Sequence, residues 1–125
     1  MLNHIVIMKF KSGTQDAEIE KLEKTLDNLP NAIAEIQMYE YGRDVIRSEQ
    51  SYDFAIVSLF ANQEALHRYE THPDYLAVLE KTNKLCENII TVDFQGTDAG
   101  DLKQKSAYDQ LLEDFGDMGN INSAE

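Results

Sequence analysis

The sequence predicts an α+β domain of the ferredoxin-like type, in which the elements follow the order βαββαβ around one antiparallel sheet. The hydropathy period alternates between that of a strand and that of a helix in this order. The first and third strands of the series are apolar on both faces, as expected at the centre of a sheet, where right-handed crossovers place them. The chain has 125 residues, of which 42% are apolar, so it suits a single domain with one small core.

The first strand and the first helix have the clearest patterns. Residues 4–11 read HIVIMKFK, a short run with apolar side chains on both faces, which predicts a strand covered on both sides. Thr14 is a suitable N-cap, and apolar residues at helical spacing predict an amphipathic helix over residues 15–29. We expect this helix to end before Pro30, because proline cannot donate a backbone hydrogen bond within a helix.

Two further strands follow the first helix. Ile36 and Met38 alternate with polar residues, which predicts a half-buried strand. Tyr39 and Tyr41 then fall on the polar side, and we interpret this change of phase as a bulge or twist near a sheet edge. Residues 52–60 are apolar on both faces and predict the third strand.

The second helical region is interrupted by His72 and Pro73. Asn62 is expected to cap a short helix before the interruption, and Pro73 suits the first turn of the helix after it. The apolar stripe then continues through Leu76, Leu79 and Leu85 to Cys86. Residues 88–94 alternate and predict the last strand, with one face formed by Ile90, Val92 and Phe94.

One face of this sheet lacks a cover within the chain. A two-layer domain packs its helices on one face only, yet both central strands carry apolar side chains on both faces. An exposed apolar patch of roughly several hundred Å² is unusual on a soluble monomer. A second copy of the chain is the simplest cover, so the sequence predicts a homodimer in which the two sheets form a dimeric α/β barrel.

A change of composition divides the chain into two regions. Residues 95–101 are rich in glycine and short polar residues, so we expect a domain over 1–97 and an acidic linker with a C-terminal helix over 98–125. The second region carries 7 acidic and 2 basic residues, a net charge of −5. We expect its helix to dock on the domain or on the partner subunit through Tyr108, Leu111, Leu112 and Phe115.

Charge and composition argue against several classes of partner. The chain has 11 basic and 23 acidic residues, a net charge of −12, and both nucleic acid and anionic membranes are bound by clustered Lys and Arg. No apolar run approaches the ~18 residues of a membrane-spanning helix, and no signal-peptide pattern opens the sequence. Cys86 is the single cysteine and cannot form an intrachain disulfide, so we expect a cytoplasmic location.

Three segments of the chain resemble the stress-responsive dimeric α/β-barrel (Dabb) family. The first is HIVIMKFK in the opening strand, the second is YGRDV at 41–45, and the strongest is FANQEALHRYETHPDYLAVL at 60–79. The resemblance covers residues 2–95 with all elements in order and leaves out the C-terminal region. It implies a homodimer in which two four-stranded sheets face each other as a barrel, with the helices outside.

The resemblance also implies candidate catalytic residues. In a plant polyketide-cyclase member of the family, a tyrosine and a histidine around a Y-x-x-H-P-x-H segment are assigned to an aldol-type ring closure. Aligned by that segment, Tyr69 falls on the catalytic tyrosine and His72 on the histidine before the proline. His4 falls on a pocket-lining histidine of the first strand. Tyr75 stands where the catalytic histidine would be, and a tyrosine with a pKa of ~10 is a poor base at neutral pH.

Each candidate also has a structural interpretation. His4 suits a core or interface position, Tyr69 lies on the apolar stripe of its helix, and His72 suits the cap of the next helix. For a chemical role, His4 or His72 would act as the base, because imidazole titrates near pH ~6.5, and Tyr69 would donate to an oxyanion. The candidate ligand contacts are the aromatic residues Tyr75, Phe54 and Phe60.

Metal and cofactor sites are not indicated by the sequence. His67 and His72 are five positions apart, but Pro73 interrupts the helix and no carboxylate stands at ligand spacing to both. No phosphate-binding loop, nucleophile elbow or paired-cysteine motif is present, and Cys86 suits a buried structural thiol. We therefore expect no metal and no cofactor.

Two functions remain open from the sequence. The first is a stress-associated homodimer of unassigned activity that binds a small apolar or aromatic ligand. The second is a polyketide-cyclase-like or related enzyme that abstracts a proton from a small molecule in the pocket between helices and sheet. A closed pocket filled by aromatic side chains favours the first, and an open cavity of roughly several hundred Å³ beside the candidate residues favours the second.

Overall fold

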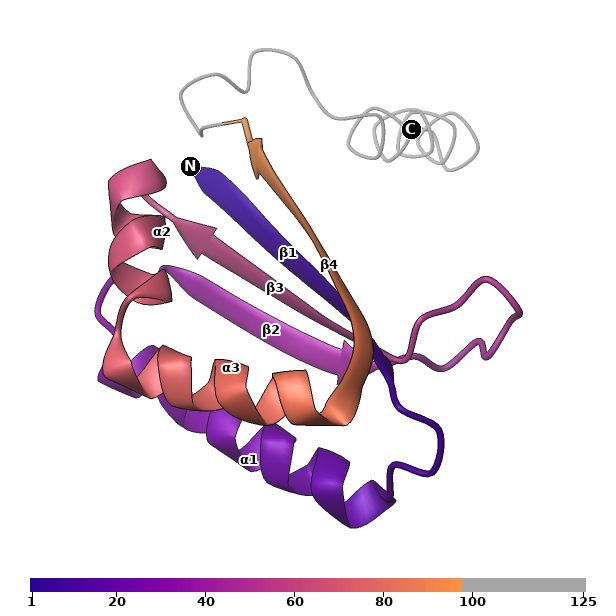
Figure 1. The fold of residues 1–125 in the computed structure, drawn as a ribbon. Coiled ribbons are helices and arrows are strands. Elements are labelled where there is room, and N and C mark those ends of the chain that lie inside the picture. The colour runs from indigo at the N-terminus through magenta and orange to yellow at the C-terminus, as the bar shows by residue number, and fades with distance from the viewer. Residues whose placement is uncertain (98–125) are drawn as a thin grey trace, which may run out of the picture.

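The computed structural model describes residues 1–97, and within them a four-stranded antiparallel sheet packs against three helices (Figure 1). The elements are β1 (Leu2–Phe10), α1 (Asp16–Ala32), β2 (Met38–Arg43), β3 (Phe54–Phe60), α2 (Gln63–Glu70), α3 (Pro73–Leu85) and β4 (Cys86–Gln95). Their order confirms the ferredoxin-like βαββαβ prediction. The C-terminal helix expected within 98–125, and with it the second of the two expected regions, lies outside the described residues.

The strand order in the sheet is β2-β3-β1-β4, so the two strands that are apolar on both faces lie at its centre. All pairs are antiparallel, and the register places His4 of β1 opposite Ser58 of β3 on one side and Asp93 of β4 on the other. The sheet is therefore ordered as the sequence predicts, with β2 and β4 at the edges.

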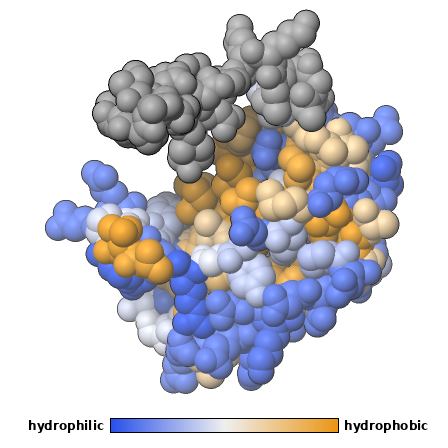
Figure 2. Space-filling model, turned by 180° about the vertical axis from the view of Figure 1, so that it is seen from behind, coloured by the Kyte–Doolittle hydropathy of each residue, from blue (hydrophilic) through white to orange (hydrophobic). Residues whose placement is uncertain are grey.

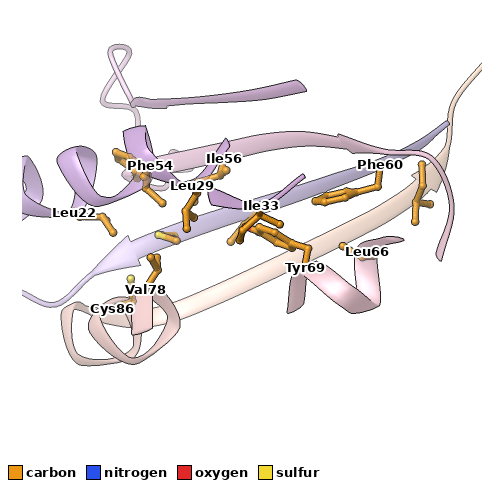
Figure 3. Close-up of a cluster of buried hydrophobic side chains, with 14 of the residues drawn as sticks. Leu22, Leu29, Ile33, Phe54, Ile56, Phe60, Leu66, Tyr69, Val78 and Cys86 are labelled. Carbon is orange, nitrogen blue, oxygen red and sulfur yellow. The ribbon is translucent and has the colours of Figure 1, made fainter. Parts of the chain in front are cut away.

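The core lies between the helices and one face of the sheet. Alternate residues of β1 and β3 point toward the helices and are buried, whereas their neighbours on the other face are half-buried, apart from the exposed Lys9. Leu22, Leu26 and Leu29 of α1 meet these strand residues from the opposite layer. Figure 3 shows the labelled side chains of both layers pointing toward one another.

The predicted phase of β2 was wrong. Tyr39 and Tyr41 lie on the helix-facing side and are half-buried, and the pairing of β2 with β3 runs without interruption from Met38 to Arg43. The apolar Ile36 precedes the strand, so the alternation that we assigned to it belongs to the turn after α1. A register shift does occur where β1 pairs with β4, between Lys9 and Phe10.

The predicted start and end of the first helix were also wrong. Helix α1 continues through Pro30 to Ala32, because the backbone N–H of Ile33 donates to the carbonyl of Leu29 at 2.9 Å and closes the last turn. At the start, Gln15 takes the N-cap position without a side-chain bond, whereas the hydroxyl of Thr14 donates to the carbonyl of Lys11.

The caps of the other two helices follow the sequence more closely. The side chain of Asn62 accepts a hydrogen bond from the backbone N–H of Ala65 at 2.9 Å, which confirms the predicted cap of α2. In α3, however, Val78 and Thr82 take the buried positions, and Leu76 is 47% exposed rather than part of the core. Cys86 is buried and free, as predicted.

The second face of the sheet is uncovered in a single chain, and we call it the open face. Figure 2, seen from behind, shows apolar side chains gathered over the strands. The large apolar residues of this face that are most exposed belong to the edge strands: Met38 at 37%, Ile90 at 45%, Val92 at 55% and Phe94 at 46%. Within residues 1–97, no helix has the length and apolar character to cross a membrane.

Candidate functional site

A buried histidine stands at the centre of the candidate site. His4 points from β1 into the layer between sheet and helices and is 2% exposed. Its Nδ1 hydrogen-bonds with a carboxylate oxygen of Asp93, which pairs with it across β1 and β4. Since a carboxylate only accepts hydrogen bonds, Nδ1 is the donor in this contact. Nε2 is buried without a hydrogen-bond partner among the described residues.

Aromatic rings surround this histidine. The rings of Phe60 and Tyr69 meet it edge-on, with centroids 6.3 and 6.2 Å away. Tyr69 comes from α2 and in turn packs against Tyr75 of α3, with ring centroids 4.4 Å apart. The hydroxyl of Tyr69 lies 3.4 Å from that of Tyr39 on β2. Four different elements therefore bring His4, Tyr69, Tyr75 and Tyr39 into one region.

Burial keeps the three tyrosines of this region in the neutral form. Desolvation raises the pKa of Tyr69 far above its ordinary value, and the neighbouring Tyr39 raises it further. Desolvation also raises the pKa of Tyr39, to about 12. The pKa of Tyr75 is raised by burial first and then by the negative charges of Glu70 and Asp93. These phenols can donate hydrogen bonds but cannot serve as bases near neutral pH.

A small cavity lies beside the tyrosines. Its volume is about 90 Å³, and Tyr39, Tyr69 and Tyr75 line it together with aliphatic side chains from both layers. His4 and His72 are not among its lining residues. The volume is below the roughly 300–1,000 Å³ that is typical of ligand pockets. The single chain therefore encloses space for a small molecule at most.

The structure does not bring His72 to this region as a base. It occupies the N-cap of α3, where its Nδ1 accepts a hydrogen bond from the backbone N–H of Asp74 at 3.1 Å. The predicted capping role of His72 therefore explains its position before Pro73. His67 is exposed on α2. No group of three His, Cys, Asp or Glu side chains suited to a metal ion occurs within residues 1–97.

The two phenylalanine candidates are buried in the core, and neither lines the tyrosine cavity. Phe60 is fully buried and packs against Tyr69, with ring centroids 4.9 Å apart. Phe54 is 2% exposed at the other end of β3 and stacks on Tyr41. Sequence reasoning did not find Asp93 or Tyr39, whose roles depend on strand register.

The fold and the site define a class: a ferredoxin-like α+β domain with one open sheet face and a small tyrosine-lined cavity behind the other. The profile of the stress responsive A/B barrel domain matches residues 2–95. The chain therefore belongs to the stress-responsive A/B barrel (Dabb) family.

Individual relatives cover most of the same region. The chain is 26% identical over 98 residues to the stress-response A/B barrel domain-containing protein HS1 of Arabidopsis thaliana, a match that covers 77% of this chain and 90% of the relative. It is 25% identical over 95 residues to olivetolic acid cyclase of Cannabis sativa, covering 74% and 94%. Among solved structures, a dimeric ferredoxin-like protein of unknown function from Thermobifida fusca superimposes with a TM-score of 0.71 at 26% identity, covering 76% and 90%.

Proposed function

We propose that this protein acts as a homodimeric stress-responsive α/β-barrel protein whose cavity binds a small apolar or aromatic molecule. The observation that carries the dimer is the open face of the sheet. Its central residues Ile5, Ile7 and Val57 are apolar, and the edge residues Ile90 and Val92 are about half exposed. The Thermobifida fusca relative is described as dimeric, which supports the same assembly here.

A second copy would gain free energy by removing this surface from water. Burial of apolar area contributes roughly 25 cal/mol per Å², and a sheet face offers a contiguous area rather than scattered side chains. Two such faces pack about 10 Å apart in sheet sandwiches, with interdigitated side chains. The helices already cover the opposite face, so the dimer would consist of two facing sheets with helices outside.

The lining of the cavity suits a small aromatic ligand. Tyr39, Tyr69 and Tyr75 offer ring faces for stacking and neutral hydroxyl donors, while Val78 and Ile89 offer aliphatic contacts. A volume of about 90 Å³ limits the occupant to a compact ring unless side chains move. No charged side chain is among the lining residues, so a neutral ligand would leave no buried charge unpaired.

Sedimentation equilibrium and a ligand titration test the two parts of the proposal. The wild-type protein is expected to sediment as a dimer at micromolar concentration. Phenol, the probe, is expected to shift amide NMR signals of residues around the cavity. Val78→Phe should abolish these shifts, because the new ring occupies the cavity. Ala77→Phe, one position earlier on the exposed side of α3, is the matched control and should leave them unchanged.

A second function is favoured by the unpartnered nitrogen of His4. With Nδ1 held by Asp93, Nε2 is the free acceptor and would abstract a proton adjacent to a carbonyl. Tyr69, whose ring lies beside His4, would donate a hydrogen bond to the developing oxyanion. The likeness to olivetolic acid cyclase supports this alternative. Tyr75 counts against it, because it stands where the family resemblance implies the catalytic histidine.

Exchange of carbon-bound hydrogen for deuterium tests the alternative function. Acetophenone, a small aromatic ketone, would lose its methyl protons in D₂O faster with protein than without it. His4→Asn should remove the acceleration, and His67→Asn, at an exposed position of α2, should not. Circular dichroism of both variants separates loss of chemistry from loss of folding. Equal exchange rates with and without wild-type protein would remove the support for a proton-abstracting enzyme.

A further inference from the structure

A groove runs along the outer side of the helix layer, between α1 and α3. The two helices lie side by side against the same face of the sheet (Figure 1). Where α1 begins and α3 ends, a hollow of about 210 Å³ is lined by Leu22 and Leu85. A second hollow of about 300 Å³ lies between the end of α1 and the start of α3, over Leu29 and Ala77. We call the two hollows together the helix groove.

Lysine side chains stand on both sides of the helix groove. Four exposed lysines line it, two from each helix: Lys21, Lys24, Lys81 and Lys84. They are four of the 9 basic residues among residues 1–97, which also contain 16 acidic residues. Of the four, Lys84 alone forms an ion pair within residues 1–97, with Glu80 at 3.4 Å. Positive charge is therefore concentrated on one surface of an acidic domain.

Three carboxylates of α1 are directed away from these lysines. Asp16 and Glu23 form ion pairs with Arg43 of β2. Asp27 hydrogen-bonds with Tyr41 of the same strand. Strand β2 is the sheet edge opposite β4, the strand that follows α3. These carboxylates therefore lie on the side of α1 that faces away from α3, and they leave the lysines of the helix groove without their charge.

The helix groove combines apolar walls with like charges that face each other. Two acidic residues line it, Glu18 at one end and Asp74 at the other. Between them, lysines of the two helices stand on opposite sides. Like charges repel, and an anion placed between them relieves the repulsion. The helix groove therefore suits an occupant that has an apolar side with carboxylates on its flanks.

Residues 108–115 (YDQLLEDF) have the complementary sequence pattern. Their apolar members recur at helical spacing and form one stripe: Tyr108, Leu111, Leu112 and Phe115. At about 100° per residue, Asp109 and Asp114 fall on opposite sides of this stripe. No basic residue occurs in the sequence from 106 to 125. A helix over this segment would present an apolar side with a carboxylate on each flank.

The chain leaves the sheet at the end of the domain where the second hollow lies. Strand β4 ends at Gln95, and the register places this residue at the same end of the sheet as Leu2 and Phe60. Helix α1 ends and α3 begins at that end as well, because α1 runs back from the end of β1 and α3 follows the short α2 after β3. Residues 96–107 span up to about 40 Å when extended, which exceeds the roughly 33 Å of a strand as long as β4. The acidic segment can therefore reach the helix groove of its own chain.

We propose that residues 108–115 dock as a helix into the helix groove of their own chain. The apolar stripe then lies on the leucines of the groove, and the flanking carboxylates lie beside the lysines. Leu26 and Val78, on the inner side of the same two helices, line the tyrosine cavity, so the docked segment also braces the outer wall of that cavity. The helix groove and the open face lie on opposite sides of the domain, so this docking does not depend on the proposed dimer.

A nitroxide label in the full-length chain tests the docking. In Gln110→Cys the label sits on the side of the segment opposite the apolar stripe, so it points away from the helix groove. We expect it to broaden the amide NMR signals of residues along the groove, such as Lys24 and Ala77. Cys86 is buried, so wild-type protein treated with the same reagent gives the background. Sharp signals along the whole groove would overturn the proposal.

A change in the apolar stripe separates docking from mere proximity. Leu112→Asp, added to the labelled chain, should abolish the broadening, because it places a carboxylate against the apolar wall of the groove. Ile121→Asp is the matched control: it makes the same kind of change at an apolar residue outside the stripe and should leave the broadening as it is. Equal broadening in the two variants would contradict docking through the stripe.

Charge reversal tests the part played by the lysines. Lys21→Glu combined with Lys81→Glu should remove most of the broadening, because the groove would then repel the segment. Arg47→Glu combined with Arg68→Glu changes the net charge of the chain equally at positions that do not line the groove, and it should leave the broadening in place. An equal loss in both double variants would show only a general charge effect and would overturn the assignment to this groove.

Two last measurements fix the pairing and the copy. Asp109→Lys with Asp114→Lys should restore the broadening in the chain whose groove charges are reversed. If it does not, the flanking carboxylates do not meet the groove lysines and the proposed geometry is wrong. Isotope-labelled chains without nitroxide, mixed with nitroxide-bearing chains without the isotope, should keep sharp groove signals. Broadening in that mixture would place the segment on another copy and overturn docking within one chain.

Discussion

Replacing Val57 by aspartate is the most direct perturbation of the open face. Val57 lies on β3 and belongs to the open face, where it is directly opposite Ile5 on β1 and Glu40 on β2. In one chain it is half-buried, so an aspartate there keeps its carboxylate in contact with water. The loss to the single chain is then mainly β-propensity and the nearby like charge of Glu40, about 1 kcal/mol.

The cost in the dimer is much larger. Each copy would place a carboxylate under the facing sheet, with a desolvation cost of several kcal/mol per ion and no cation opposite. Each copy would also lose the burial of a valine side chain, worth roughly 1.5 kcal/mol. The two lost valine side chains alone account for about 3 kcal/mol, and with the two carboxylates the sum exceeds about 4 kcal/mol, which corresponds to at least about a thousandfold rise in the dissociation constant.

Sedimentation equilibrium over a wide concentration range measures this change. Val57→Thr keeps the shape of valine but adds an uncharged hydroxyl, so it is the control that isolates the effect of the charge, with an expected rise smaller than that for aspartate. Thermal melts by circular dichroism show whether the monomeric variant is folded. If Val57→Asp kept the wild-type dissociation constant, Val57 would lie outside the interface and the assignment of the open face as the dimer surface would be wrong.

Three further predictions concern the core and its titratable groups. Leu26→Ala removes a fully buried side chain and should lower the free energy of unfolding, measured by urea titration, by ~2–5 kcal/mol. Leu76→Ala, at an exposed site of α3, is the control. An equal loss of stability in the two variants would contradict the core assignment. Folding raises the pKa of Tyr39 to about 12 and also raises those of Tyr69 and Tyr75, so their contribution to stability is full below pH ~10 and is lost as pH rises toward 12. Tyrosinate absorbance should therefore lag behind that of free tyrosine and appear together with unfolding. Burial raises the pKa of the Cys86 thiol to about 11, so a thiol reagent at neutral pH should label the native protein far more slowly than the unfolded one.

The sequence contained enough information for the architecture because burial leaves a periodic pattern. Strands β1 and β3 are apolar on both faces, and that property placed them at the sheet centre. The same reasoning failed for β2, where tyrosines carry both a ring and a hydroxyl. Tyr41 faces the helices, and its hydroxyl hydrogen-bonds with Asp27 and with the carbonyl of Glu23 on α1. Because of that polar hydroxyl, the sequence pattern placed Tyr41 on the polar side of the strand although its ring packs in the interior.

The candidate site was predictable by residue type but not by geometry. His4 and Tyr69 were identified, and the structure brings their rings together. Asp93 was not identified, because its contact with His4 depends on the register between strands that are 89 positions apart in sequence. The cavity volume depends on how Tyr39, Tyr69 and Tyr75 pack, and a linear pattern of residues does not specify side-chain packing.

The site and the open face share the same two strands, and this links assembly to chemistry. His4 and Asp93 face the helices, while the adjacent Ile5 and Val92 form a pair on the open face. A slip of β4 by one residue against β1 would exchange the two faces of β4. Its apolar open-face side chains would then point toward the helices, and the His4–Asp93 contact would be lost. A partner that buries Ile5 and Val92 therefore stabilises the register that holds the histidine. By thermodynamic reciprocity, a ligand that binds only when His4 is held by Asp93 would also strengthen the dimer.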